Sequence, residues 1–146
     1  MSFTDFITDN GKRVNKESFI HLIQVAMADG GIDSKELALL HRFGRRFSLS
    51  DHEVDVLIKA ESTHFYSPPH ELEKRFEHLY NAVEIILVDN QISVEEKNLF
   101  RKLAISASFS DETITRLFDL LVEGIREDKD ENELFEKFRK ARFFRS

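Results

Sequence analysis

The feature of this sequence that most restricts its fold is a segment that recurs sixty positions further along the chain. The stretch that starts at Asp29 has the same pattern as the stretch that starts at Asp89: an acid, two turn-forming residues, an isoleucine, and a glutamate seven positions after the acid. The match extends outwards at the same offset and keeps apolar residues with apolar residues, as in Phe19 and Leu79. A self-match at a fixed period indicates an internally duplicated architecture.

Apolar residues recur at helical spacing along almost the whole chain. Glycine and proline are scarce, with five and two among 146 residues, and no long strict alternation indicates a strand. The sequence therefore predicts an all-α fold, a single compact bundle of about seven helices with an internal duplication, within one domain. The predicted parts of residues 1–146 are a first repeat at about 16–66, a second repeat at about 69–127 and a C-terminal helix at about 131–144.

Several helix starts carry recognisable capping signals. Ser50 and Ser93 are each followed three residues later by glutamate, the pattern of a capping box, and Asp33 precedes Glu36 at the same spacing. Such a cap contributes about 0.5–2 kcal/mol to helix stability. We expect Glu36 to return the hydrogen bond to the backbone of Asp33.

Two further segments give local predictions. Pro68 and Pro69 form the strongest break in the chain, and proline is tolerated in the first turn of a helix, so a long helix is predicted from about Pro69 to Val88. Near the N-terminus, the apolar cluster from Phe3 to Ile7 predicts a short helix that covers the core.

The pattern of the repeated loop resembles that of a known family. Residues 28–36 read Ala-Asp-Gly-Gly-Ile-Asp-Ser-Lys-Glu, and residues 88–96 are a second copy in register. Together with the order of the helices, these copies make the chain similar to the tellurite-resistance TerB-like family, roughly from Phe19 to Ile125. The second copy departs from the pattern, because Asn90 and Gln91 stand where the first copy has glycines.

The resemblance implies a compact fold of roughly seven helices in an intracellular bacterial protein linked to stress or metal-ion responses. It also implies a non-enzymatic role, since the family is generally without catalytic activity. Some members bind divalent cations or dock with membrane-associated partners. These implications come from the resemblance alone.

The acids of the two loops are the candidate metal ligands. Hard cations such as Ca²⁺, Mg²⁺ and Mn²⁺ prefer several oxygen ligands, which clustered carboxylates provide. If the two repeats pair about a pseudo-twofold axis, Asp29 and Asp89 would face one another. The alternative is that the acids only cap helices and stabilise turns. The candidate ligands are Asp29, Asp33, Glu36, Asp89 and Glu96.

Composition and motifs exclude several classes of function. The net charge of −6 argues against nucleic acid as a partner, and no uncharged apolar run approaches the roughly 20 residues that span a bilayer. The start of the chain has no signal-peptide pattern, and cysteine is absent, so we expect a cytoplasmic protein. No motif of a P-loop, a nucleophile elbow or a dinucleotide fold occurs, and we expect no enzymatic activity.

Two other groups of residues remain candidates. His64 and His70 flank the proline break and could approach each other as zinc ligands. The segment 137–145 interleaves basic residues with phenylalanine, which suits an acidic partner, an anionic membrane surface or nucleic acid. The favoured alternative is a last helix whose cations complement its own dipole, with Phe138 in the core. Phe143 and Phe144 are the best candidates for an exposed docking patch.

Two hypotheses about function follow. The first is a TerB-like binding or scaffold module of a stress response that holds a divalent cation in its acidic loops. The second is a metal-independent protein-interaction module that uses a phenylalanine-rich surface or a helical groove.

Overall fold

The structure is a computed structural model that describes residues 4–8, 11–28 and 30–141. Within these residues the chain forms seven α-helices, one short 3-10 helix and a two-stranded hairpin. The elements in chain order are β1 (Phe6–Ile7), β2 (Arg13–Val14), α1 (Lys16–Met27), α2 (Ser34–Arg46), α3 (Asp51–Ala60), α4 (Leu72–Ile86), η1 (Leu87–Asp89), α5 (Val94–Ser106), α6 (Asp111–Arg126) and α7 (Glu131–Lys140). The predicted all-α fold of about seven helices is confirmed.

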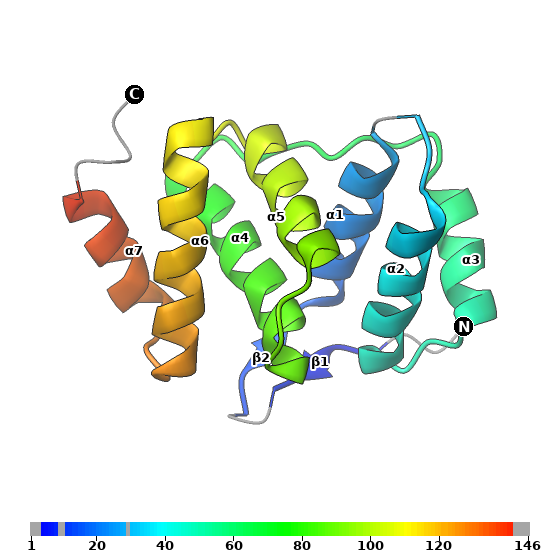
Figure 1. Ribbon diagram of the computed structural model, residues 1–146, viewed down its shortest axis with the longest axis horizontal. Coiled ribbons are helices and arrows are strands. Elements are labelled where there is room, and N and C mark those ends of the chain that lie inside the picture. Colours follow the sequence, from blue (N-terminus) through cyan, green and yellow to red (C-terminus); the bar gives the residue numbers. More distant parts are fainter. Residues whose placement is uncertain (1–3, 9–10, 29, 142–146) are drawn as a thin grey trace.

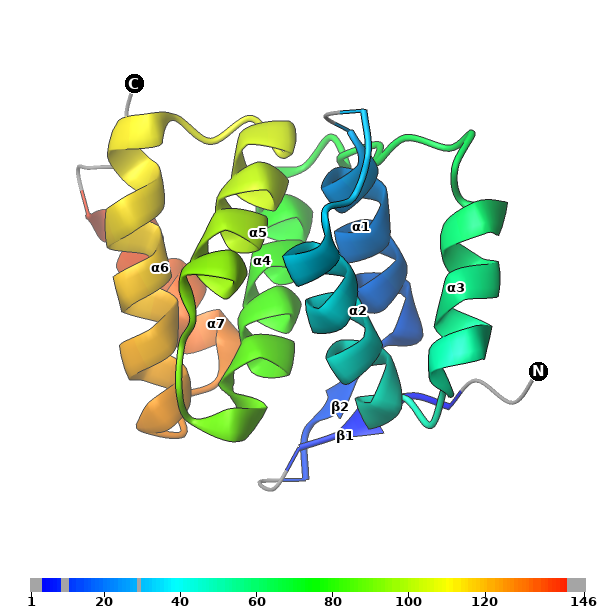
Figure 2. The same cartoon turned by 45° about the vertical axis from the view of Figure 1, so that its right-hand side comes forward.

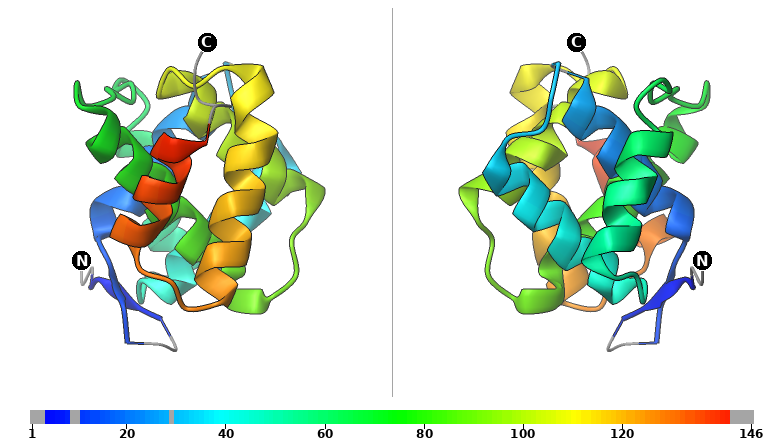
Figure 3. Two further views of the ribbon diagram at one scale, coloured as in Figure 1. Left: turned by 90° about the vertical axis from the view of Figure 1, so that its left-hand side faces the viewer. Right: turned by 90° about the vertical axis from the view of Figure 1, so that its right-hand side faces the viewer.

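The helices are arranged around a central pair, α1 and α4. Helices α2 and α5 cover one side of this pair, with α3 at one edge and α6 and α7 at the other (Figure 1, Figure 2). The views onto the two edges show α3 beside α2, and α7 beside α6 (Figure 3). Because its neighbours lie on several sides, α4 buries five consecutive residues, Ala82 to Ile86.

Phenylalanine fills much of the core, as its abundance suggests. Phe19 of α1 stacks on Phe47 with ring centroids 5.5 Å apart, and Phe76 of α4 stacks on Phe138 of α7 at the same separation. Aromatic rings bury large apolar areas without a polar group that needs a partner. These rings therefore join helices that are far apart in the sequence.

The predicted helix starts agree with the structure. Ser50 and Ser93 form complete capping boxes with Glu53 and Glu96, in which the serine hydroxyl and the glutamate carboxylate each accept a backbone N–H. The Asp33 carboxylate accepts the backbone N–H of Glu36 at 2.8 Å. The Glu36 carboxylate, however, takes a tertiary partner.

The helix predicted near the N-terminus is wrong for the part that the structure describes. Phe6 and Ile7 form strand β1, which pairs antiparallel with Arg13 and Val14, while residues 1–3 lie outside the described residues. Phe6 and Val14 face the core, and Ile7 and Arg13 face outwards. A two-residue strand is too short to show alternation in the sequence, so its pairing was not predictable from periodicity.

The predicted start of the fourth helix is also wrong. Helix α4 begins at Leu72, so Pro68 and Pro69 precede the helix and belong to an extended connection from α3. The residue before a proline is disfavoured in the helical region, which keeps this connection non-helical. At the other end of the chain, α7 ends at Lys140, and residues 142–146, including the predicted docking pair Phe143 and Phe144, lie outside the described residues.

The sixty-residue offset reappears in the helix boundaries. Helices α2 and α5 start and end sixty residues apart, and α3 and α6 start sixty residues apart. Ser48 and Ser108, which share the offset, both take left-handed backbone conformations, with φ of 65° and 71°. These agreements fit the predicted repeat, and an origin by duplication stays a prediction.

No helix in the described part of the chain is both long enough and apolar enough to cross a membrane.

Replacing Gly44 with alanine should test the packing of α3. Gly44 lies inside α2, and a Cβ there would overlap the side chain of Val54 and contact the ring of Phe19. Glycine to alanine inside a helix normally stabilises by about 0.5–1 kcal/mol. Here we expect Gly44→Ala to destabilise by about 1–3 kcal/mol because of overpacking, as measured by urea unfolding.

The control is the double variant Gly44→Ala with Val54→Ala. Since the smaller side chain at position 54 leaves room for the new Cβ, the double variant should be no less stable than Val54→Ala alone. A stabilising effect of Gly44→Ala on its own would contradict this packing.

Candidate functional site

The two acidic loops lie at opposite ends of the molecule. The α1–α2 connection is at the top of Figure 1, and the α4–α5 connection is at the bottom. Helices α2 and α5 start from these loops and run antiparallel. The structure therefore does not gather the acids of both loops into one site. Asp29 lies outside the described residues, so its predicted position opposite Asp89 is not described.

Two of the predicted ligands instead form reciprocal ion pairs between α2 and α5. Glu36 Oε2 lies 2.7 Å from Lys102 Nζ, and Glu96 Oε2 lies 3.2 Å from Arg42 Nη2. Each glutamate sits sixty residues from the other, and so do the two cations. The Glu96 side chain is only 1% exposed and the Arg42 side chain is 43% exposed. The charge of the buried carboxylate is therefore neutralised by a cation at the surface.

Asp89 belongs to the same network. Its Oδ2 lies 2.8 Å from Arg46 Nη2 and 3.5 Å from Arg42 Nε. Arg46 is largely buried, donates a hydrogen bond to the carbonyl oxygen of Ile85 and stacks over the ring of Phe43, with Cζ 5.0 Å from its centroid. Burial lowers the pKa of Arg46, while the adjacent Asp89 opposes that shift. Arg46 thereby joins α2 to the end of α4.

These contacts give the predicted metal ligands other partners. Asp33 caps α2, while Glu36, Asp89 and Glu96 face the cationic side chains of lysine or arginine. Among residues 4–8, 11–28 and 30–141, no three or more histidine, aspartate or glutamate side chains are grouped so that they could hold a metal ion. A divalent cation in the acidic loops stays a prediction.

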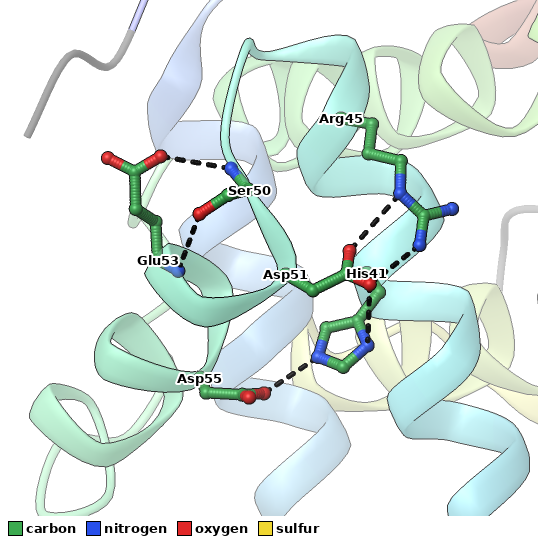
Figure 4. Close-up of polar contacts among 6 residues, drawn as sticks. All are labelled: His41, Arg45, Ser50, Asp51, Glu53 and Asp55. Atoms are coloured by element: carbon green, nitrogen blue, oxygen red, sulfur yellow. Dashed lines mark hydrogen bonds and ion pairs between the residues drawn. The ribbon is translucent and has the colours of Figure 1, made fainter.

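A second polar cluster joins α2 to α3 (Figure 4). His41 Nε2 lies 2.7 Å from Asp55 Oδ1, and His41 Nδ1 lies 3.9 Å from Asp51 Oδ2. Arg45 donates two hydrogen bonds to Asp51, at 2.8 and 3.1 Å, and these bonds lower the pKa of the Asp51 carboxyl. Both nitrogens of the imidazole face carboxylates, so the cluster acts as a bridge between helices. From the sequence, only the Ser50 cap at the start of α3 was predicted in this region.

The neighbouring cap at the start of α3 is fully formed. In Figure 4 the hydroxyl of Ser50 accepts the backbone N–H of Glu53 at 3.1 Å, and the Glu53 carboxylate accepts the backbone N–H of Ser50 at 2.9 Å. The second of these bonds lowers the pKa of Glu53.

A group of like charges lies between α4 and α7. Glu73, Glu77, Asp130 and Glu131 line a hollow of about 370 Å³. Burial and the nearby charges of Glu77 and Glu73 together raise the pKa of Glu131 to about 7, although Lys74 opposes the shift. This group of acids was not predicted from the sequence.

Two histidines that the sequence did not pair lie together in the structure. His64 Nδ1 lies 3.7 Å from Glu61, whereas His21 of α1 and His78 of α4 stack with ring centroids 4.3 Å apart. Their contact depends on the α1–α4 packing. Local spacing in the sequence gives no sign of it.

An exposed stripe on α5 carries two aliphatic side chains. Val94, Asn98, Arg101 and Ile105 lie on one side of the helix, and we call this stripe the α5 face. Val94 is 67% exposed and Ile105 is 49% exposed. Large aliphatic side chains at this exposure, on one stripe, are typical of interaction sites when they adjoin grooves.

Two hollows flank the α5 face. One, of about 330 Å³, lies between α5 and the start of α2 and has a largely charged rim. The other, of about 180 Å³, lies between α5 and α6, where Phe100, Ile114 and Phe118 supply apolar lining. In Figure 1, α5 stands in front of the central helices with α6 on one side and α2 on the other. This face was not predicted from the sequence.

No family model, curated protein or solved structure matches the chain. The resemblance to the TerB-like family therefore stays a prediction based on the repeated loop.

Breaking the ion pair between Arg42 and the buried Glu96 should lower the free energy of unfolding more than breaking an exposed ion pair. In Arg42→Met the Glu96 carboxylate loses its cation while it remains buried, and we expect a loss of about 2 kcal/mol in the free energy of unfolding, as measured by urea denaturation. The matched control is Arg139→Met, whose partner Glu136 is half exposed, and it should cost no more than about 0.5 kcal/mol. Equal losses in the two variants would contradict this account.

Divalent cations should not stabilise the acidic loops selectively. Thermal unfolding in EDTA and then with Ca²⁺, Mg²⁺, Mn²⁺ or Zn²⁺ should give the same melting temperature, because three of the predicted ligands already have cationic partners. A ligand at a hundred times its Kd would add about 2.7 kcal/mol to the free energy of unfolding. A selective rise that disappears in Asp29→Ala would instead establish a metal site.

Proposed function

We propose that this chain is a non-enzymatic protein-interaction module that needs no metal and docks its partner on the α5 face. The single observation that carries the proposal is the pair of exposed aliphatic residues, Val94 and Ile105, on one stripe between two hollows. Burying such side chains against a partner is favourable by about 25 cal/mol per Å² of apolar surface.

The size of the face fits a short segment of a partner. Val94 and Ile105 are eleven residues apart on α5, which corresponds to about 16 Å along the helix axis. Three turns of a partner helix cover that length. The hollow beside α6 offers apolar lining from Phe100, Ile114 and Phe118 for one or two anchoring side chains.

The rim of the face carries both signs of charge in fixed positions. Arg101 Nη2 lies 2.6 Å from Asp111 of α6, and Lys102 Nζ lies 2.7 Å from Glu36 of α2. These pairs hold α5 to its neighbours on both sides. A surface that is rigid before binding loses less conformational entropy when the partner docks, which supports a preformed site.

The ion pairs of the acidic loops support this proposal over the metal hypothesis. A cation bound at Glu36, Asp89 or Glu96 would have to replace a lysine or arginine that already neutralises each carboxylate. The loops then serve the module by fixing how α2 and α5 meet. A role in a TerB-like stress response, with a membrane-associated partner, stays a prediction from the resemblance.

Introducing negative charges into the α5 face tests the proposal. The double variant Val94→Glu with Ile105→Glu should lose its protein partners by at least tenfold when the tagged chain is cross-linked in a lysate of its source and the captured proteins are quantified. Since both side chains are exposed, the free energy of unfolding should change by no more than about 1 kcal/mol.

Val56→Glu is the matched control, because Val56 is an exposed aliphatic residue on α3, away from the α5 face. It should capture the same proteins as the unmodified chain. If the α5 variant and the control retain the same partners, the α5 face is not the docking site. Sedimentation of the three proteins distinguishes a second copy of the chain from a different partner.

A further inference from the structure

The connection between α3 and α4, residues 61–71, carries a cluster that the proposed docking function does not use. It is non-helical from His64 onwards and bears Phe65, which is 80% exposed. Two tertiary hydrogen bonds hold it to the central helices. Gln24 Nε2 donates to Glu61 Oε1 at 2.9 Å, and the hydroxyl of Tyr66 lies 2.8 Å from Nδ1 of His78.

Three aromatic rings meet where the connection touches the helices. The ring of Tyr66 contacts His21 edge-on at 5.1 Å and His78 at 5.8 Å, and the two imidazoles stack at 4.3 Å. His21 Nδ1 is buried without a hydrogen-bond partner. A lone pair left unpaired costs less than an N–H left unpaired, so this site favours the neutral imidazole.

We infer that His21, Tyr66 and His78 form an acid-sensitive latch that holds α3 and the 61–71 connection on α1 and α4 and opens on proton uptake. When both imidazoles are protonated, two like charges lie at stacking distance, and His21 gains a buried N–H without an acceptor. In the tautomer whose Nδ1 accepts from the Tyr66 hydroxyl, protonation of His78 also turns that nitrogen into a donor.

The charges around the latch do not remove this sensitivity. On α4, Glu77 raises the pKa of His78, but burial lowers it more and Lys74 adds to the lowering. Burial lowers the pKa of His21 to about 4, and His78 contributes to that shift. On the connection, His64 and Glu61 lie 3.7 Å apart, and Tyr66 remains a neutral phenol because burial raises its pKa to about 12. Arg75 on α4 opposes the Tyr66 shift.

The direction of the pH effect follows from these shifts. The closed state binds fewer protons than the open state wherever the histidine pKa is lowered from 6.5, so closure is fully favoured above about pH 6.5 and is lost as the pH falls towards about 4. For His21 alone, the difference between the ordinary pKa of 6.5 and the lowered pKa of about 4 is large enough to raise the ratio of open to closed molecules by about two orders of magnitude at low pH.

Helix α3 is the part that would be released. Val54 is the one residue of α3 that is fully buried, and Leu57 and Ile58 are partly buried against the core. The helix is otherwise held to α2 by the pairs that Asp51 and Asp55 form with Arg45 and His41. Helices that bury few apolar side chains open at lower free-energy cost than the core. Opening would uncover Phe19, which Val54 and Gly44 border.

Hydrogen exchange at pH 7 and pH 5, corrected for the intrinsic rates, tests the latch in the full chain. Peptides from residues 51–66 should exchange at least tenfold faster at pH 5, while peptides from α6 remain protected. In the double variant His21→Phe with His78→Asn, the rate at 51–66 should change less than twofold, because neither new side chain titrates and the introduced amide oxygen still accepts from Tyr66. His70→Asn, which replaces an exposed histidine on the same connection, should behave as the unmodified chain.

Two further measurements keep the outcome decisive if the double variant does not fold. Tyr66→Phe should already raise exchange of residues 61–66 at pH 7 without affecting α6. Proton NMR titration of the unmodified chain should give a pKa below the ordinary value of 6.5 for both His21 and His78. The proposal is overturned if both histidines titrate at 6.5 or above, if α6 exchanges in step with α3, or if the non-titrating variant keeps the pH response.

Discussion

The structure depends above all on the burial of two central helices, α1 and α4, which bury about half of their residues. In α4 five consecutive residues are buried, and in α1 six of twelve positions are buried. A helix with a buried face this wide must be covered on several sides, and the remaining five helices provide that cover. The outer helices then need only one apolar stripe each, which leaves their other sides free for charges.

Two ion pairs support the register between α2 and α5. Glu36 meets Lys102, and Glu96 meets Arg42, so the two contacts are fixed at both ends of an antiparallel pair. The same glutamates stand at the third position of their helices, where sequence reasoning reads them as caps. Glu96 performs both tasks, since one of its carboxylate oxygens accepts from Ser93 and the other faces Arg42.

Local signals in the sequence predicted what is locally determined. The helix starts at Ser50, Ser93 and Asp33 follow from side chains that bond to the backbone three residues away, and the structure confirms them. The hairpin at Phe6 did not follow, because its strands are too short for periodicity and are held by their contact with the core.

The residues around the candidate sites were hidden for a related reason. The partner of Glu36 is sixty-six positions away and the partner of His21 is fifty-seven positions away, so neither pairing has a spacing that a motif could reveal. A carboxylate in a repeated loop looks the same in the sequence whether a cation, a backbone amide or a distant lysine neutralises it. Three-dimensional proximity decides between these: it provides lysine or arginine for Glu36, Asp89 and Glu96, and a backbone amide for Asp33.

The α5 side and the α3 side of the molecule are held by different contacts. We therefore assign docking to the α5 side and the response to protons to the α3 side. Around α5, ion pairs and the apolar contacts of α6 fix a surface that suits docking. Around α3 and the 61–71 connection, one fully buried valine, the pairs with His41 and Arg45, and the hydrogen bonds of Glu61 and Tyr66 hold a segment that suits a response to protons. Helix α2 packs against both α3 and α5. Any influence of the latch on a partner at the α5 face must therefore pass through α2, where His41 and Arg45 bind α3 while Arg42 binds Glu96 of α5.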